Sequence, residues 1–383
     1  MSVTAARGFT AAGIAAGIKQ NGNRDLALVV NNGPRCAAAG VFTSNRVQAA
    51  PVQWSRQILA DGRIRAVVLN SGGANACTGP QGFQDTYATA EKAAEQLGLD
   101  AADVAVCSTG LIGVPLPMAR ILAGVETAAT RLSESGGEDA AVAVMTTDTV
   151  HKTAAVTRDG WTVGGMAKGA GMLAPGLATM LVVLTTDADL DSAVLDRALR
   201  DATRSTFDRV DSDGCMSTND TVLLLASGAG EATPEYAEFA DAVHEVCADL
   251  ARQLIGDAEG ASKEIRIEVV GAASEDDAVE VGRSVARNNL LKCAIHGEDP
   301  NWGRVLSAIG TTSAVFEPDR LGVAINGVWV CKNGSVGEDR TLVDMTGREV
   351  GITVDLAAGA DFAVIWANDL TAEYVHENSE YAS

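Results

Sequence analysis

The stretch GGMAKGAGMLAPGLATMLVVLTTD, residues 164–187, joins a glycine-rich loop to an apolar strand at Ala178 and Thr179. Glycines permit backbone conformations that other residues avoid, and Pro175 fixes the φ angle within the turn. Residues 180–184 form an apolar run of strand length. The local pattern alone therefore predicts a loop that enters a buried strand.

A second interpretation of this stretch is that the chain cuts itself before Thr179. Ala178 is small, which leaves its carbonyl open to attack by the Thr179 hydroxyl. The attack would convert the peptide bond into an ester, and hydrolysis would leave Thr179 as a new N-terminus whose amine can activate its own hydroxyl. A phosphate-binding loop is excluded, because Lys168 is followed by Gly169 and not by Ser or Thr.

The composition predicts a compact, soluble protein that is long enough for two domains. Of its 383 residues, 47% are hydrophobic and 4% aromatic. The charges sum to 29 − 50 = −21, and no basic run offers a phosphate-binding stripe, which argues against nucleic acid as a partner. No stretch approaches the roughly 18 to 20 apolar residues that span a bilayer, and no signal-peptide pattern begins the chain.

The cysteines and histidines indicate neither disulfides nor a metal site. Seven cysteines are scattered without a CxxC spacing, which is typical of reduced thiols in a cytoplasmic protein. Four histidines are dispersed without the spacing of zinc ligands, so we expect no metal.

Hydrophobic periodicity predicts an α/β chain that changes character near residue 260. Short apolar strands are expected at residues 26–30, 39–43, 66–69 and 104–107, and helices at 86–97, 192–204 and 234–255. The segments KTAAVT and WTVGGM flank Asp159 and Gly160, which predicts a hairpin with a type I′ turn. From about residue 265 the strand and helix patterns predict a second, smaller α/β unit that packs directly against the first.

Polar loops follow several of the predicted strands and are candidates for chemistry. Ser108-Thr109-Gly110 follows an apolar strand, where a hydroxyl and a backbone N–H could both face one oxyanion. An ordinary turn is the alternative for this tripeptide, and a tight loop is the alternative for NSGGANACTG at residues 70–79. HGEDPNWGR, residues 296–304, is either a charged loop pinned by Trp302 or part of a site. A serine-hydrolase elbow, G-x-S-x-G, is absent from the sequence.

Eight motifs in a fixed order carry a resemblance to a known family. They are NSGGANACTG, STGLIG, MTTDT, KGAGMLAPGLATM, STNDTVLLLASG, DAEGASK, HGEDPNWGR and ENSEYAS. Across essentially all 383 residues, the chain resembles the ornithine acetyltransferase (ArgJ) family of glutamate N-acetyltransferases in arginine biosynthesis. The resemblance implies an α/β fold, a layered sandwich of mixed β-sheets and helices of the ArgJ/DmpA-like type with an N-terminal-nucleophile site. It also implies a catalytic domain over residues 1–260 and a smaller C-terminal α/β domain over 261–383.

The resemblance also assigns catalytic roles by motif. It implies self-cleavage between Ala178 and Thr179, which gives an α chain of residues 1–178 and a β chain of residues 179–383. Thr179 becomes the nucleophile, and the Thr109 hydroxyl with the Gly110 N–H forms the oxyanion hole. The positions that match substrate contacts are Thr146, Lys168, Thr179, Glu259, Asn378 and Ser383.

The residue types suit the implied substrates, N-acetylornithine and glutamate. Lys168 can pair with a carboxylate and Glu259 with an ammonium group, so an amino acid is held at both charged ends. Asn378 and Ser383 require that the C-terminal tail folds back over the site. The chain departs from the commoner family pattern at residues 72–73, before Thr179 and in its last residues, which leaves the Ser383 contact open.

The implied reaction is a ping-pong transfer of the acetyl group from N-acetylornithine through Thr179 to glutamate, without a metal or organic cofactor. The implied assembly is two α and two β chains. Three alternatives stay open: a self-processing N-terminal-threonine amidohydrolase or aminopeptidase, a bifunctional enzyme that also takes acetyl-CoA, and an unprocessed scaffold protein.

Overall fold

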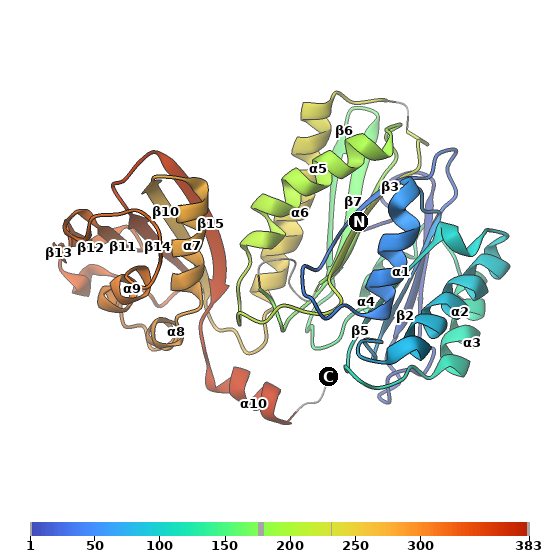
Figure 1. The fold of residues 1–383 in the computed structure, drawn as a ribbon, viewed down its shortest axis with the longest axis horizontal. Helices are drawn as coiled ribbons and strands as arrows, with labels where there is room; N and C mark the ends of the chain where they lie inside the picture. The colour runs from blue at the N-terminus through green and yellow to red at the C-terminus, as the bar shows by residue number, and fades with distance from the viewer. Residues whose placement is uncertain (1, 175–179, 231, 381–383) are drawn as a thin grey trace.

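The structure is a computed structural model, and it describes residues 2–174, 180–230 and 232–380. Over these residues the chain forms three mixed sheets with helices packed against them. Two sheets lie face to face in the larger part of the molecule, and the third lies to one side with its own helices (Figure 1). The predicted α/β class, a layered sandwich of mixed sheets and helices, is confirmed.

The first sheet has the strand order β1-β2-β4-β5. Its strands are β1 (Phe9–Ile14), β2 (Leu26–Asn31), β4 (Ala66–Ser71) and β5 (Val104–Thr109). Every residue of β2, β4 and β5 is buried, because helices cover one face and the second sheet covers the other. Burial on both faces explains why these strands read as continuous apolar runs.

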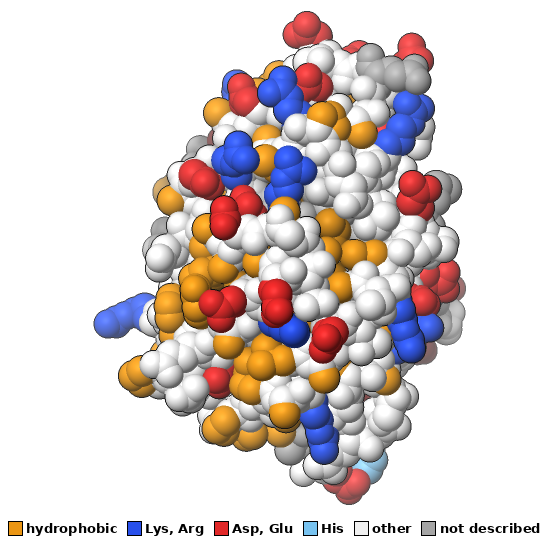
Figure 2. Space-filling model, turned by 90° about the vertical axis from the view of Figure 1, so that its right-hand side faces the viewer, with side chains coloured by type: hydrophobic (Ala, Val, Ile, Leu, Met, Phe, Trp, Pro, Cys, Tyr) orange, Lys and Arg blue, Asp and Glu red, His pale blue; other side chains and the backbone are white. Residues whose placement is uncertain are grey.

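Four helices pack around the first sheet: α1 (Ala50–Ile58), α2 (Gly79–Leu97), α3 (Met118–Ala129) and α4 (Gly137–Ala143). Helix α1 covers the edge of β5, where the Ser55 hydroxyl donates to the Val106 carbonyl at 2.7 Å and accepts from its N–H at 2.9 Å. An edge covered in this way cannot pair with another strand. On the α2 and α3 side, basic and acidic side chains lie scattered among hydrophobic ones (Figure 2).

The second sheet has the order β3-β9-β8-β7-β6. Its strands are β3 (Ala37–Phe42), β6 (Lys152–Arg158), β7 (Trp161–Lys168), β8 (Leu181–Thr186) and β9 (Thr221–Ala226). Val183 and Leu223 face the first sheet, whereas Val182 and Leu224 pack beneath helices α5 (Ser192–Ser205) and α6 (Tyr236–Gly256). The layers of this part are therefore helix, sheet, sheet, helix.

The predicted hairpin forms as β6 and β7, with Arg158 opposite Trp161. Gly160 has a φ of 85°, but Asp159 is not among the residues of positive φ. A type I′ turn needs a positive φ at both central residues, so the predicted turn type is wrong. The physical reason is that only glycine adopts the left-handed region without a steric penalty.

The third sheet has the order β13-β12-β11-β14-β10-β15. Its strands are β10 (Glu264–Ala272), β11 (Gly322–Ile325), β12 (Val328–Lys332), β13 (Ser335–Val336), β14 (Glu349–Asp355) and β15 (Asp361–Asn368). Helices α7 (Glu275–Ala286), α8 (Asn289–His296) and α9 (Trp302–Ile309) accompany it. These elements enclose a hydrophobic core of their own. The division into domains at residues 260 and 261 stays a prediction.

The end of the chain crosses back toward the larger part. After β15, helix α10 (Ala372–Glu380) runs beneath the gap between the two parts (Figure 1). The Thr371 hydroxyl anchors its start by donating to the Gly260 carbonyl at 2.7 Å. Among the helices that the structure describes, none has the length and apolar character needed to cross a membrane.

Candidate active site

Residues from seven separate parts of the sequence line one pocket of about 270 Å³. Six of the predicted site residues are among its walls: Thr109, Gly110, Thr146, Lys168, Glu259 and Asn378. The predicted cleavage site, Ala178 and Thr179, and the predicted tail contact Ser383 lie outside the described residues. Every predicted site residue that the structure describes therefore lies in this one pocket.

Strand ends explain why these residues meet. β4 and β5 are parallel, so the loops that follow Ser71 and Thr109 leave the sheet at the same edge. There the Gly73 N–H donates to the Thr109 carbonyl at 3.0 Å. Gly110 has a φ of 128°, and a Cβ on it would lie 2.5 Å from the Gly73 nitrogen. Position 110 therefore accepts only glycine, which keeps its backbone close to the pocket.

Lys168 ends β7 and is buried, with a relative exposure of 2%. Its Nζ lies 3.5 Å from the Thr109 Oγ1 and 4.0 Å from the Asp148 Oδ2. Burial lowers the pKa of Lys168 from its usual value, and the Asp148 carboxylate acts in the opposite direction. A desolvated ammonium group in a pocket wall gains strongly from contact with an anion.

Glu259 and Asn378 bring helix α10 to the wall of the pocket. The Asn378 Nδ2 donates to the Glu259 Oε2 at 2.9 Å, and this bond joins helix α10 to the segment after α6. A Cβ on Gly171 would lie 2.5 Å from the Glu259 Oε1. The absence of a side chain at position 171 therefore leaves room for the Glu259 carboxylate.

Two residues of the STNDT motif also belong to this region, although the sequence analysis gave them no role. Asn219 lines the pocket and donates to the Ser108 carbonyl at 2.8 Å and the Ala74 carbonyl at 2.6 Å, which ties two pocket loops together. Asp220 is fully buried, and its Oδ1 accepts from the Met180 N–H at 3.1 Å. Burial raises the pKa of Asp220 well above its usual value. The sequence signal that could have identified them is a polar run directly before a buried strand.

Asp148 is another residue that the sequence analysis left without a role. It lies in the MTTDT motif, and its Oδ2 accepts from the Thr146 N–H at 2.9 Å. Its Oδ1 accepts from the Lys152 Nζ at 2.7 Å. Burial raises the pKa of this carboxyl, but Lys168 and Lys152 outweigh that effect and hold the pKa at about 2. Asp148 is therefore charged at neutral pH.

The charged loop HGEDPNWGR has structural partners outside this pocket. The His296 Nδ1 lies 3.0 Å from the Asp369 Oδ2, and Glu298 pairs with the Lys263 Nζ at 2.9 Å. Trp302 begins helix α9 and packs partly buried against the core of the third sheet. These contacts favour the interpretation of a charged loop pinned by an aromatic residue.

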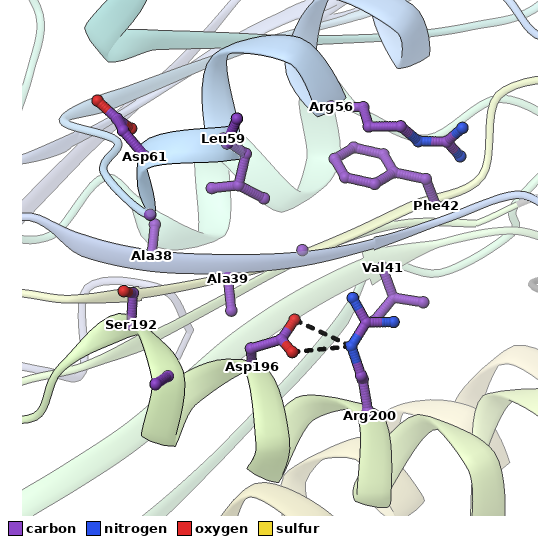
Figure 3. Close-up of a pocket in the computed structure, with 14 residues that line it drawn as sticks. Ala38, Ala39, Val41, Phe42, Arg56, Leu59, Asp61, Ser192, Asp196 and Arg200 are labelled. Carbon is purple, nitrogen blue, oxygen red and sulfur yellow. Dashed lines mark hydrogen bonds and ion pairs between the residues drawn. The ribbon is translucent and has the colours of Figure 1, made fainter.

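A larger hollow of about 670 Å³ follows β3 between α1 and α5, but it differs in chemistry from the pocket above (Figure 3). Its Arg200 pairs with Asp196 on the same helix, with Nε 2.9 Å from Oδ2. Its Arg56 stacks on Phe42 at 5.3 Å from the ring centre. None of the predicted site residues that the structure describes lines this hollow.

The chain matches known proteins over its whole length. Residues 10–383 match the model of the ArgJ family. The arginine biosynthesis bifunctional protein ArgJ of Streptomyces avermitilis is 79% identical over 383 residues, and that of Streptomyces coelicolor is 77% identical, with all of each chain covered. The crystal structure of ornithine acetyltransferase complexed with ornithine, from Mycobacterium tuberculosis, is 58% identical, with 47% of this chain and 96% of that chain covered and a TM-score of 0.45. The chain therefore belongs to the ArgJ family.

Proposed function

We propose that this protein is an acetyltransferase of arginine biosynthesis that moves the acetyl group from N2-acetyl-L-ornithine to L-glutamate. The observation that carries the proposal is the meeting of Lys168, Glu259, Thr109 and Gly110 in one pocket. A cation and an anion there suit the two charged ends of an amino acid, and the Thr109 hydroxyl with the Gly110 N–H suits a developing oxyanion. Membership of a family whose relatives are named for arginine biosynthesis supports the same conclusion.

The nucleophile in this proposal is Thr179, after cleavage of the bond that joins it to Ala178. The Thr179 hydroxyl adds to the Ala178 carbonyl carbon, the C–N bond breaks, and the nitrogen takes up the proton. Water then hydrolyses the ester and leaves an Ala178 carboxyl group and a free Thr179 amine. Support comes from Met180, the next residue, whose N–H donates to the buried Asp220 beside the pocket.

The acetyl group then moves in two balanced steps. The Thr179 hydroxyl attacks the acetyl carbonyl of N-acetylornithine while the Thr179 amine accepts its proton. The amide bond breaks, the proton passes to the leaving amine, and ornithine departs from an acetyl-Thr179 ester. The glutamate amine attacks that ester, and N-acetylglutamate leaves as the hydroxyl regains a proton. Thr109 and Gly110 stabilise both tetrahedral intermediates.

Substrate recognition in this proposal uses both charged walls of the pocket. Lys168 binds the α-carboxylate that the two substrates share, and Thr146 adds a hydroxyl beside it. Glu259 binds the ammonium group of ornithine, and Asn378 holds Glu259 in place through their bond of 2.9 Å. Ser383 completes the set as a tail contact.

The proposal extends to organisation. Residues 1–260 form the catalytic domain, and residues 261–383 form the smaller domain. The α and β chains stay associated as an assembly of two α and two β chains. The enzyme works in the cytoplasm without a cofactor.

Two measurements test the function. On a denaturing gel the wild type is expected to give two bands and Thr179→Ala one, because the variant lacks the attacking hydroxyl. With the purified processed protein, labelled acetyl is expected to pass from N-acetylornithine to glutamate. Release of acetate with no labelled N-acetylglutamate would establish the amidohydrolase alternative instead. Replacing N-acetylornithine by acetyl-CoA in the same assay decides whether the enzyme has a second donor.

A further inference from the structure

One buried carboxylate contacts both segments that carry the proposed carboxylate-binding residues. The Asp148 Oδ2 accepts from the Thr146 N–H at 2.9 Å and lies 4.0 Å from the Lys168 Nζ. The Asp148 Oδ1 accepts from the Gly169 N–H at 2.6 Å, directly after Lys168 in the chain. The Asp148 side chain has no exposed surface. It therefore joins the end of β7 to the loop after α4 from behind the pocket.

We propose that Asp148 is a positioning residue that holds Lys168 and Thr146 in a fixed geometry and keeps Lys168 charged for the substrate α-carboxylate. This inference rests on the proposed function, because it takes Lys168 to be the carboxylate-binding group. Asp148 acts through Lys168 and does not itself touch the substrate.

Asp148 is held in place from its other side. Lys152 lies in β6 opposite Ala167, is fully buried, and contacts Asp148 at 2.7 Å and Asp257 at 2.6 Å. Asp257 in turn accepts from the Thr149 N–H at 3.0 Å. Two cations and two backbone N–H groups surround the Asp148 carboxylate, so the anion that faces Lys168 is held in one position.

The charges around Lys168 make Asp148 its main anionic partner. After burial, the charged groups that act most strongly on Lys168 are Asp148, Lys152, Glu259 and Asp220, in decreasing order, and Lys19 is a further cation that interacts with both Lys168 and Asp148. Lys152 lowers the pKa of Lys168, and burial raises the pKa of Asp220 so that it favours the neutral form. Glu259 is itself one of the residues that line the pocket. Removal of the Asp148 charge therefore leaves burial and Lys152 opposed mainly by Glu259, and Lys168 loses its proton more readily.

The test compares N-acetylornithine with its α-carboxamide as acetyl donors for the processed enzyme. The wild type is expected to prefer the carboxylate, and Asp148→Asn to lose about tenfold or more of this preference in kcat/KM. In Asp148→Asn the KM for N-acetylornithine is expected to fall as the pH is lowered, because acid restores the Lys168 charge. A purely structural role would lower activity toward both donors alike at every pH.

Three further variants separate positioning from folding. Asp148→Asn with Lys152→Met removes a buried pair of opposite charges together, which preserves neutrality, and is expected to lose the same preference. Asp257→Asn, the matched control, removes the other carboxylate on Lys152 and is expected to keep the preference, as is Lys152→Met alone.

The outcomes distinguish this inference from the function on which it rests. If Asp148→Asn and the double variant both keep the wild-type preference for N-acetylornithine over its α-carboxamide, with an unchanged pH profile, the role of Asp148 is refuted. The proposed acetyltransferase function would stand. A wild type that transfers no acetyl group from N-acetylornithine would refute the proposed function and this inference with it.

Discussion

Gly171→Ala should displace the Glu259 carboxylate without disturbing the fold. A Cβ at position 171 would lie 2.5 Å from the Glu259 Oε1 and 2.6 Å from its Cδ and Oε2, whereas ordinary contacts begin near 3.4 Å. All three of its nearest atoms belong to this one side chain, and the backbone of Gly171 is outside the positive-φ region. The flexible carboxylate must therefore move by about 1 Å.

A movement of this size is enough to break the bond from the Asn378 Nδ2 to the Glu259 Oε2, now 2.9 Å long. It also withdraws the proposed partner of the substrate ammonium group. A hydrogen bond to a charged group contributes about 1.5 to 3 kcal/mol, so kcat/KM for N-acetylornithine should fall roughly 10- to 150-fold. The free energy of unfolding should change by less than about 1 kcal/mol, because Ala at a compatible position costs little.

The assay is steady-state acetyl transfer to glutamate, with denaturant unfolding and a gel for chain cleavage as checks on folding. Gly347→Ala is the matched control, because a Cβ there meets nothing within 4 Å and its φ is not positive. It should behave as the wild type. In a Glu259→Ala background, Gly171→Ala should have almost no further effect, because the side chain that it displaces is gone.

Two results would refute this reasoning. One is a Gly171→Ala enzyme whose kcat/KM stays within twofold of the wild type. The other is an equal loss of activity in the wild-type and Glu259→Ala backgrounds, which would mean that the added methyl group acts on something other than Glu259.

Three further predictions follow from the same geometry. Gly110→Ala forces a strained φ and places a Cβ 2.5 Å from the Gly73 nitrogen, so kcat should fall about 10²- to 10³-fold through loss of the oxyanion donor, measured in the transfer assay. The pKa of Asp148 is about 2, below its usual 3.8. Its ionised form therefore adds about 2 kcal/mol to the free energy of unfolding, an effect that is complete above pH 3.8 and is lost as the pH falls through 2. Denaturant unfolding at stepped pH should show this loss in the wild type and not in Asp148→Asn. Truncation after Thr371 removes α10 and with it the Asn378 bond to Glu259, so KM should rise several-fold. Because α10 has no buried residue, the thermal midpoint should change by less than about 3 °C in a melting curve.

The predicted strands were found where burial on both faces makes the sequence continuously apolar. β2, β4, β5 and β8 are all of this kind, and their expected ranges agree with the structure to within a few residues. Six helices were not predicted from the sequence: α1, α3, α4, α8, α9 and α10. α8, α9 and α10 are short, and α10 has no buried residue, so these three lack the long apolar periodicity that marks a helix in sequence.

Some residues of the candidate site could be identified from the sequence, and others only from the structure. Thr109 and Gly110 could be chosen from the sequence because they follow an apolar strand, and Lys168 because its motif matches that of the family. Asp148 and Asn219 stood in quoted motifs but received no role, because their importance comes from bonds to groups far away in the chain. Asn219, for example, donates to the Ser108 carbonyl 111 residues away.

The sequence by itself determined the α/β class, the hairpin, the family and the residue types of the site, because strand periodicity, turn residues and motifs are local properties of the chain. Only the tertiary structure decided that Lys168 lies beside Thr109, that Asp148 lies behind both carboxylate-binding segments, and that the tail reaches Glu259. These contacts depend on how two sheets stack and on how α10 returns to the segment after α6. Side-chain packing sets such distances, and packing has no signature within a single stretch of sequence.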